Sequence, residues 1–279
     1  MLKRFVLLSC FVLFLFQSAD AKSITFAQLT DIHYSQDGST NSSRNVSVSK
    51  KHLYFAIMSL NKKKPAFTVF LGDQIDKSNE DNIKEFMSYT SKLKMPYYFV
   101  LGNHDAHKMS GITKEKYLEI VSNKNPYQPA LKKNYVFKPN KDIVCIVLDG
   151  SANLVPSAHG YYSPEQISWL DKQLTLNKRK LVFIYQHFPL LPPHEHKSHE
   201  VIEPENYLKM LAKHKNVVLI SSGHYHNEGF SVDEQGIRHI STTSLLNVPP
   251  VYDMVTVEYD KDSWKDAKGT KVEVEHIRV

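Results

Sequence analysis

Five apolar segments of this chain are each followed at once by Asp, Asn or His residues. The segments span residues 24–29, 67–71, 97–101, 181–186 and 217–222, and their β-branched and aromatic content is typical of short buried strands. The motifs after them are Asp31-Ile32-His33, Gly72-Asp73-Gln74-Ile75-Asp76, Gly102-Asn103-His104-Asp105, His187-Phe188-Pro189 and Gly223-His224-Tyr225-His226. Because ligands bind at the carboxyl ends of strands in open α/β sheets, the pattern predicts one polar site assembled from five loops.

The rest of the chain alternates between strand and helix patterns, which predicts an α/β fold. Further strands are expected at 143–148, 238–241, 254–259 and 272–277, and helices at 47–60, 79–93, 113–121 and 203–214. Another helix is expected to begin at Ser163, where Pro164 occupies the first helical position and Gln166 completes a capping box. Since no linker rich in Ser, Gly or Pro divides residues 22–279, we interpret them as one domain.

The side chains in the five motifs indicate a transition-metal site. They are carboxylates, an amide and imidazoles without any thiolate, which suits Mn, Fe, Zn or Ni rather than calcium or a structural zinc. Such a site also accounts for the high histidine content, 14 of 279 residues. Seven ligands are too many for one ion, whereas two ions bridged by a carboxylate can clamp the oxygens of a displacement at phosphorus. The predicted ligands are Asp31, His33, Asp73, Asn103, His187, His224 and His226.

These motifs resemble those of the calcineurin-like metallophosphoesterase superfamily, and the resemblance spans residues 31–226. It implies a four-layer α/β/β/α sandwich in which two mixed sheets are flanked by helices. It also implies two divalent or mixed-valence metal ions, one held by Asp31, His33, Asp73 and His226 and the other by Asp73, Asn103, His187 and His224. His104 is similar to the family's histidine that protonates the leaving oxygen, with Asp105 orienting it. The residues alone leave a loop-capping role open for both Asp105 and Asp76.

Two positions place the chain within the superfamily. His33 and Asp76 differ from the pattern of purple acid phosphatases, which lack the first histidine and have tyrosine at the second position. The chain is more similar to class III cyclic-nucleotide phosphodiesterases and manganese-dependent ADP-ribose/CDP-alcohol diphosphatases. We therefore expect attack by a metal-bridging hydroxide on a phosphodiester or pyrophosphate bond in a small, nucleotide-like substrate. The alternatives are a phosphomonoesterase, including a protein phosphatase, and a non-catalytic interaction module that keeps the fold.

The first 21 residues have the pattern of a signal peptide. Lys3 and Arg4 precede an apolar run at 5–16, and Ala19-Asp20-Ala21 forms a small-x-small cleavage site. An uncleaved anchor would need roughly 20 apolar residues, and a lipoprotein is disfavoured because Cys10 lies inside the apolar run. We expect a secreted or periplasmic protein without stable membrane insertion. The net charge of +6 is too small to indicate a nucleic-acid partner.

Three further histidines, His194, His196 and His199, lie close together before the last predicted helix. A solvated loop or a lid beside the site is the simplest interpretation, and a third metal site is the alternative. Cys145 lies in an apolar strand pattern and is expected to be an inert core thiol.

Overall fold

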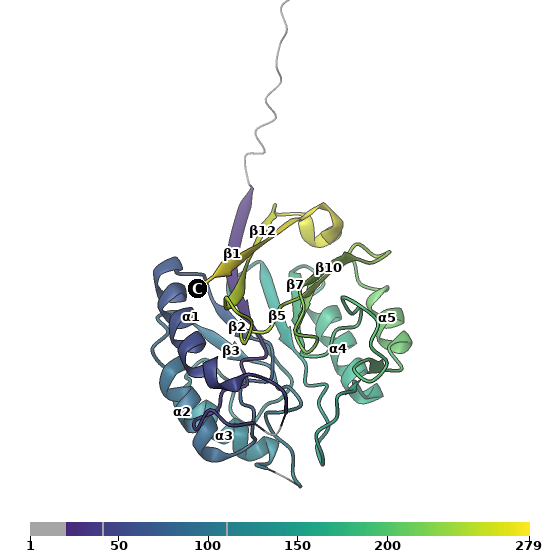
Figure 1. Cartoon of the computed structure of the whole chain (residues 1–279). Coiled ribbons are helices and arrows are strands. Elements are labelled where there is room, and N and C mark those ends of the chain that lie inside the picture. Colours follow the sequence, from purple (N-terminus) through teal and green to yellow (C-terminus); the bar gives the residue numbers. More distant parts are fainter. Residues whose placement is uncertain (1–20, 41, 110) are drawn as a thin grey trace, which may run out of the picture.

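A computed structural model describes residues 21–40, 42–109 and 111–279. The predicted signal peptide, residues 1–21, lies outside the described residues apart from Ala21. Two large mixed sheets lie between two groups of helices, with α1 to α3 on one side and α4 and α5 on the other (Figure 1). Among the described residues, no helix combines the length and apolar character needed to cross a bilayer.

The first sheet has five strands in the order β13-β12-β1-β2-β3. Strands β1 (Lys22–Leu29), β2 (Thr68–Phe70) and β3 (Tyr97–Phe99) are parallel to one another. Strands β12 (Val251–Tyr259) and β13 (Lys271–Arg278) extend the sheet in antiparallel fashion beyond β1. The parallel strands therefore present their carboxyl ends at one edge.

The second sheet has six strands in the order β10-β11-β9-β7-β5-β4. Its four central strands are parallel to one another: β5 (Ile143–Val147), β7 (Leu181–Tyr185), β9 (Val217–Ser222) and β11 (Arg238–Ser241). The antiparallel strands β4 (Tyr135–Phe137) and β10 (Gly229–Val232) form its edges. A separate two-stranded parallel sheet joins β6 (Gly160–Tyr161) to β8 (Val201–Ile202).

Three apolar cores separate four layers. In β1, Phe26 packs into the core between the sheets, whereas Ala27 faces the core under α1 to α3. In β5, Cys145 faces the central core and Val144 faces the core under α4 and α5. Because side chains alternate between the two faces of a strand, each sheet buries both faces. This arrangement confirms the predicted α/β/β/α sandwich.

In the described part of the chain, five α-helices cover the outer faces: α1 (Ser49–Lys63), α2 (Glu80–Thr90), α3 (Lys114–Lys124), α4 (Pro164–Leu176) and α5 (Glu205–Leu211). The predicted start of α4 is confirmed, because Gln166 N donates to Ser163 Oγ and Ser163 N donates to Gln166 Oε1. The sequence analysis missed β4, β6, β8 and β10, which have two to four residues each. Segments this short show no clear alternation of polar and apolar residues.

Candidate metal centre

The five predicted motifs converge at the carboxyl ends of β1, β2, β3, β7 and β9. Several of their residues have backbone in the left-handed region, with φ of 50° at Asp31, 44° at His33, 51° at Asp73, 70° at His224 and 57° at His226. This conformation is uncommon for residues other than glycine, and strained backbone of this kind clusters at functional sites. The loops after β1, β2 and β9 thus turn sharply, and side chains of all five motifs lie close together.

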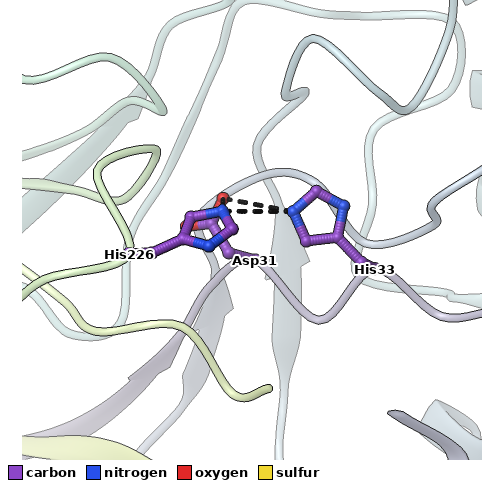
Figure 2. A group of neighbouring side chains, drawn as sticks. All are labelled: Asp31, His33 and His226. Atoms are coloured by element: carbon purple, nitrogen blue, oxygen red, sulfur yellow. Dashed lines mark hydrogen bonds and ion pairs between the residues drawn. The ribbon is translucent and has the colours of Figure 1, made fainter. Parts of the chain in front are cut away.

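The first group of side chains consists of Asp31, His33 and His226 (Figure 2). The Nε2 atoms of His33 and His226 lie 3.2 Å apart, and Asp31 Oδ1 lies 3.2 Å from His226 Nε2 and 3.8 Å from His33 Nε2. His33 and Asp31 come from the loop after β1, whereas His226 comes from the loop after β9. Loops of both sheets therefore build this group.

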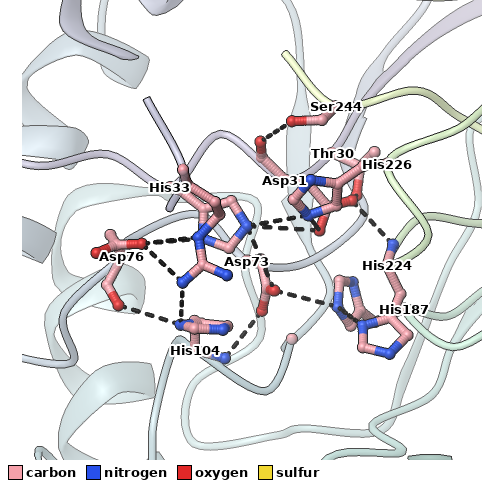
Figure 3. A network of polar contacts seen from close by, with 12 residues as sticks. Thr30, Asp31, His33, Asp73, Asp76, His104, His187, His224, His226 and Ser244 are labelled. Atoms are coloured by element: carbon pink, nitrogen blue, oxygen red, sulfur yellow. Dashed lines mark hydrogen bonds and ion pairs between the residues drawn. The ribbon is translucent and has the colours of Figure 1, made fainter. Parts of the chain in front are cut away.

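The second group consists of Asp73, His187 and His224, and Asp73 links it to the first (Figure 3). Asp73 Oδ2 lies 3.5 Å from His187 Nε2 and 3.7 Å from His33 Nε2. His224 Nδ1 lies 3.2 Å from His187 Nε2. The carboxylate of Asp73 thus lies between the two groups of side chains.

Backbone carbonyls fix which ring nitrogens of the second group carry protons. His187 Nδ1 donates to Leu71 O at 2.7 Å, and His224 Nε2 donates to Ala158 O at 2.7 Å. A carbonyl can only accept, so His224 Nδ1 presents a lone pair to the centre, and His187 Nε2 does so once His187 has lost its second proton. Metal-binding histidines typically donate their second N–H in this way.

Burial and neighbouring charges set the protonation of the cluster. Burial lowers the pKa of His33 to about 4 and that of His224 to about 3, so both imidazoles are neutral at pH 7. Burial also opposes the charge of His187, but the Asp73 carboxylate outweighs it and raises the pKa of His187 to about 9. Burial alone would raise the pKa of Asp31, but the neighbouring His226 outweighs this effect and holds the pKa of Asp31 below its usual range. Metal binding at His187 must therefore displace a proton.

The donor set fits two transition-metal ions. Two imidazole nitrogens about 2.0–2.1 Å from one ion lie about 2.9–3.4 Å apart in octahedral or tetrahedral geometry, and each of the two groups contains such a pair at 3.2 Å. Asp31 Oδ1 and Asn103 Oδ1 are buried and accept no hydrogen bond from the described residues. Buried polar atoms normally have partners, so these oxygens are suited to ligate metal.

Two glycines allow the loops to approach this closely. A Cβ on Gly223 would collide with Thr30 Oγ1 and lie 2.8 Å from Asp31 Oδ2. A Cβ on Gly102 would collide with the backbone N and Oδ1 of Asp73. The glycines before the motifs thus create space for the ligand carboxylates.

The expected contact between Asp105 and His104 is not present in the structure. Both carboxylate oxygens of Asp105 instead accept backbone N–H groups, from Gly102 at 2.7 Å, Asp73 at 3.0 Å, Gln74 at 2.7 Å and Ile75 at 3.2 Å. Among the described residues, no hydrogen bond or ion pair joins Asp105 to the His104 ring. Orientation of His104 by Asp105 is therefore corrected to the loop-holding alternative, because the tight turns leave four buried N–H groups that need an acceptor.

His104 is positioned by other residues. Its backbone N donates to Asp73 Oδ1 at 2.9 Å, and its Nδ1 donates to the carbonyl of Asp76 at 3.2 Å. Its ring lies edge-on to that of His33, with 4.9 Å between the centroids. The proton on Nδ1 leaves Nε2 as the ring nitrogen that can exchange a proton with a substrate.

Arg44 is a site residue that the sequence analysis missed. Its Nη2 lies 3.0 Å from Asp76 Oδ1 and 3.5 Å from His104 Nδ1. Arg44, Asp76 and His104 line a cleft of about 600 Å³ together with Ser42, Lys77, Ser78, Asn79, His107 and Pro156. A single arginine in a Ser- and Asn-rich segment, without a strand before it, gives no motif by which it could be found.

Comparisons with known proteins agree with this geometry. The sequence profile described as calcineurin-like phosphoesterase matches residues 24–228. The chain is 25% identical to the manganese-dependent ADP-ribose/CDP-alcohol diphosphatase of Bos taurus, over 85% of this chain and 88% of that protein. It is 26% identical to a probable glycerophosphodiester phosphodiesterase of Arcobacter nitrofigilis, over 63% of each chain.

A solved structure shares the fold. The crystal structure of a dimetal phosphatase from Danio rerio matches with a TM-score of 0.70 and 18% identity, and the match covers 91% of this chain and 98% of that chain. At this level of identity the match supports the four-layer architecture alone.

Proposed function

Because the chain belongs to the calcineurin-like phosphoesterase family and is a hydrolase that acts on phosphoester bonds, we propose that it cleaves a phosphodiester or pyrophosphate bond in a small, nucleotide-like substrate. The observation that carries this proposal is the cationic cleft beside His104. Its relatives support the same class, since one is a diphosphatase for ADP-ribose and CDP-alcohols and another a probable glycerophosphodiester phosphodiesterase.

We assign the two groups of side chains to two metal ions. Asp31, His33, Asp73 and His226 would hold the first, and Asp73, Asn103, His187 and His224 the second. The support is the position of Asp73 between the two groups, the paired imidazole nitrogens, and the buried oxygens of Asp31 and Asn103 that accept no hydrogen bond in the described part of the chain. When bound, such ions polarise phosphoryl oxygens and lower the pKa of a coordinated water to about 7. The manganese dependence of one relative makes Mn²⁺ the first ion to test.

His104 is the proposed general acid. It lies beside the shared carboxylate of Asp73, and the Asp76 carbonyl holds its Nδ1. Nε2 can then deliver a proton to the leaving oxygen, a contribution of typically 10²–10⁴ in rate. Because His104 lines the cleft, the departing group would lie in the cleft.

The cleft favours a diester or pyrophosphate over a monoester in this proposal. A monoester has one substituent on phosphorus, whereas the proposed substrates carry a second group that must be bound. Arg44 and Lys77 line the cleft, and a guanidinium matches the geometry of a phosphate oxygen pair. The cleft therefore suits a leaving group that itself carries a phosphate.

The direct test is a hydrolysis screen with Mn²⁺. ADP-ribose, CDP-choline, glycerophosphocholine and cyclic nucleotides are compared with nucleoside monophosphates, and bis(p-nitrophenyl) phosphate with p-nitrophenyl phosphate. Diesters or diphosphates should give the higher kcat/KM. A clear preference for monoesters would favour a phosphomonoesterase that uses the same centre.

Two variants connect the screen to the structure. Arg44→Gln should raise KM for diphosphates more than for bis(p-nitrophenyl) phosphate, because the latter has no second phosphate for Arg44 to bind. Asp73→Asn should lower both metal content and activity, since it weakens the shared ligand. Lys133→Gln serves as a matched control because Lys133, like Arg44, is a cation with an acidic partner, but it lies outside the cleft. An equal loss of kcat/KM for all substrates in Arg44→Gln would remove Arg44 from substrate recognition.

We also propose export of the protein, with cleavage after Ala21. The support is the charged and apolar pattern of residues 3–21. Amino-terminal sequencing of protein from the periplasm or medium should begin at Lys22. Retention of an uncleaved chain in the cytosol would contradict this proposal.

A further inference from the structure

A loop outside the candidate centre brings two further imidazole nitrogens close together. The histidine loop, residues 194–199, carries His194, His196 and His199. His196 Nδ1 and His199 Nδ1 lie 2.8 Å apart, and Ser198 Oγ lies 3.0 Å and 2.9 Å from them. Two imidazole nitrogens therefore converge on one point, as they do in each buried pair.

The small β6–β8 sheet places this loop beside the second group. Strand β8 begins just after the loop and pairs with β6 through Gly160 and Val201. The residue before β6, His159, contacts Glu200 O through Nδ1 at 3.3 Å. The ring of His199 lies 5.0 Å from that of His224, centroid to centroid. The segment that contains His159 and β6 is thus held against the end of the histidine loop, where His199 lies beside His224.

The chemistry of the loop differs from that of the buried groups. His196 and Ser198 are exposed and His199 is half-buried, and no carboxylate contacts His196 or His199 in the described part of the chain. A site of imidazoles completed by water suits borderline or soft divalent ions such as Zn²⁺, Ni²⁺ or Cu²⁺, whereas Mn²⁺ and Mg²⁺ favour oxygen ligands. His194 is a further imidazole nearby, with its ring 6.5 Å from that of His196.

We propose that His196 and His199 form a third, solvent-exposed binding site for a divalent transition-metal ion of the Zn²⁺ or Ni²⁺ type. The site uses ligands that are separate from the seven assigned to the buried centre. It therefore does not rest on the proposed hydrolysis, and it can exist whatever the substrate is.

The test is metal stoichiometry of the mature chain. Wild-type protein is stripped of metal, dialysed against buffered Zn²⁺ and measured by elemental mass spectrometry, then the same is done for His196→Ala/His199→Ala. We expect three ions per chain for wild type and two for the double variant. Lys197→Ala, which changes the same loop without removing an imidazole, should retain three. Ni²⁺ should give the same difference, and Mn²⁺ should give two ions in all three proteins.

A location-sensitive measurement completes the test. Anomalous difference density at the zinc edge should show the third ion between His196 and His199 in wild-type crystals and not in the double variant. Activity with Mn²⁺ alone should stay within about twofold of wild type in both variants, which also shows that the loop changes leave the fold intact. Equal Zn²⁺ content in wild type and the double variant, or a third ion located elsewhere, would overturn the proposal.

Discussion

Replacing Asp105 by Asn should release metal rather than impair proton transfer. The carboxylate is fully buried, and each of its oxygens accepts two backbone N–H groups. Burial and the neighbouring Asp73 carboxylate raise the pKa of Asp105 to about 8, but four N–H donors leave neither oxygen free to carry a proton, so the geometry favours the ionised form. Asparagine keeps one acceptor oxygen and places an NH₂ group where the other was. Two buried N–H groups, either those of Gly102 and Asp73 or those of Gln74 and Ile75, would then face a donor.

The size of the effect follows from this count. A hydrogen bond to a charged group contributes about 1.5–3 kcal/mol, so the loss of two should cost about 3–6 kcal/mol. For a chain of this size, 1 kcal/mol shifts Tm by roughly 2–4 °C, which gives a decrease of at least about 6 °C. Because Asp105 holds the backbone of Asp73, the shared ligand, the variant should also contain fewer than two metal ions per chain.

The assay is differential scanning fluorimetry together with metal analysis and turnover per bound metal pair. Asp171→Asn is the control, since Asp171 is half-buried and its carboxylate is paired with His214. Asp105→Asn should lower Tm and metal content while turnover per metal pair stays near that of wild type. An unchanged Tm and metal content with reduced kcat would refute this reasoning and restore the role of orienting His104.

Three further predictions concern other residues. His104→Ala should lower kcat by roughly 10²–10⁴ and retain metal; metal release without loss of turnover per metal pair would contradict the assigned role. His276 donates to Asp253 at 2.7 Å, and this bond raises the pKa of His276. The stabilising effect of this bond is complete below the pKa of His276 in the unfolded chain and is lost as pH rises through its pKa in the folded protein. Between pH 6 and pH 8, the Tm of wild type should therefore fall more than the Tm of His276→Gln. Parallel curves of Tm against pH for the two proteins would disprove this. Lys114 and Asp149 form a buried ion pair at 2.6 Å, and Lys114→Met should cost about 3–5 kcal/mol in urea unfolding; a cost below 1 kcal/mol would show that Lys133, 3.8 Å from Asp149, or solvent compensates the carboxylate without Lys114.

The sequence was sufficient to predict the architecture and the convergence of the metal-binding motifs. Both follow from local signals, because each motif directly follows a strand whose apolar residues are adjacent in sequence. The contact between His33 and His226 joins residues 193 positions apart, yet it was predictable because the carboxyl ends of strands meet at one edge.

What the sequence did not predict depends on contacts without a local pattern. The role of Asp105 required knowledge of which backbone N–H groups remain unpaired after the turns at Asp73 and Gly102. Arg44 reaches Asp76 from a segment with no regular structure, so proximity arises from tertiary packing alone. The short strands β6 and β8 form because distant loops meet, and two residues are too few for any periodicity.

The division of ligands between the sheets has a mechanical consequence. Asp31, His33, Asp73 and Asn103 follow strands of the first sheet, whereas His187, His224 and His226 follow strands of the second. Under the proposed assignment, each ion is bonded to both sheets and acts as a cross-link between the two halves of the sandwich. Loss of the ions would remove this link between the two sheets. Backbone amide hydrogen exchange measured after chelation should therefore accelerate first at the carboxyl ends of β2 and β7. The metal centre would then stabilise the packing of the two sheets in addition to its role in catalysis.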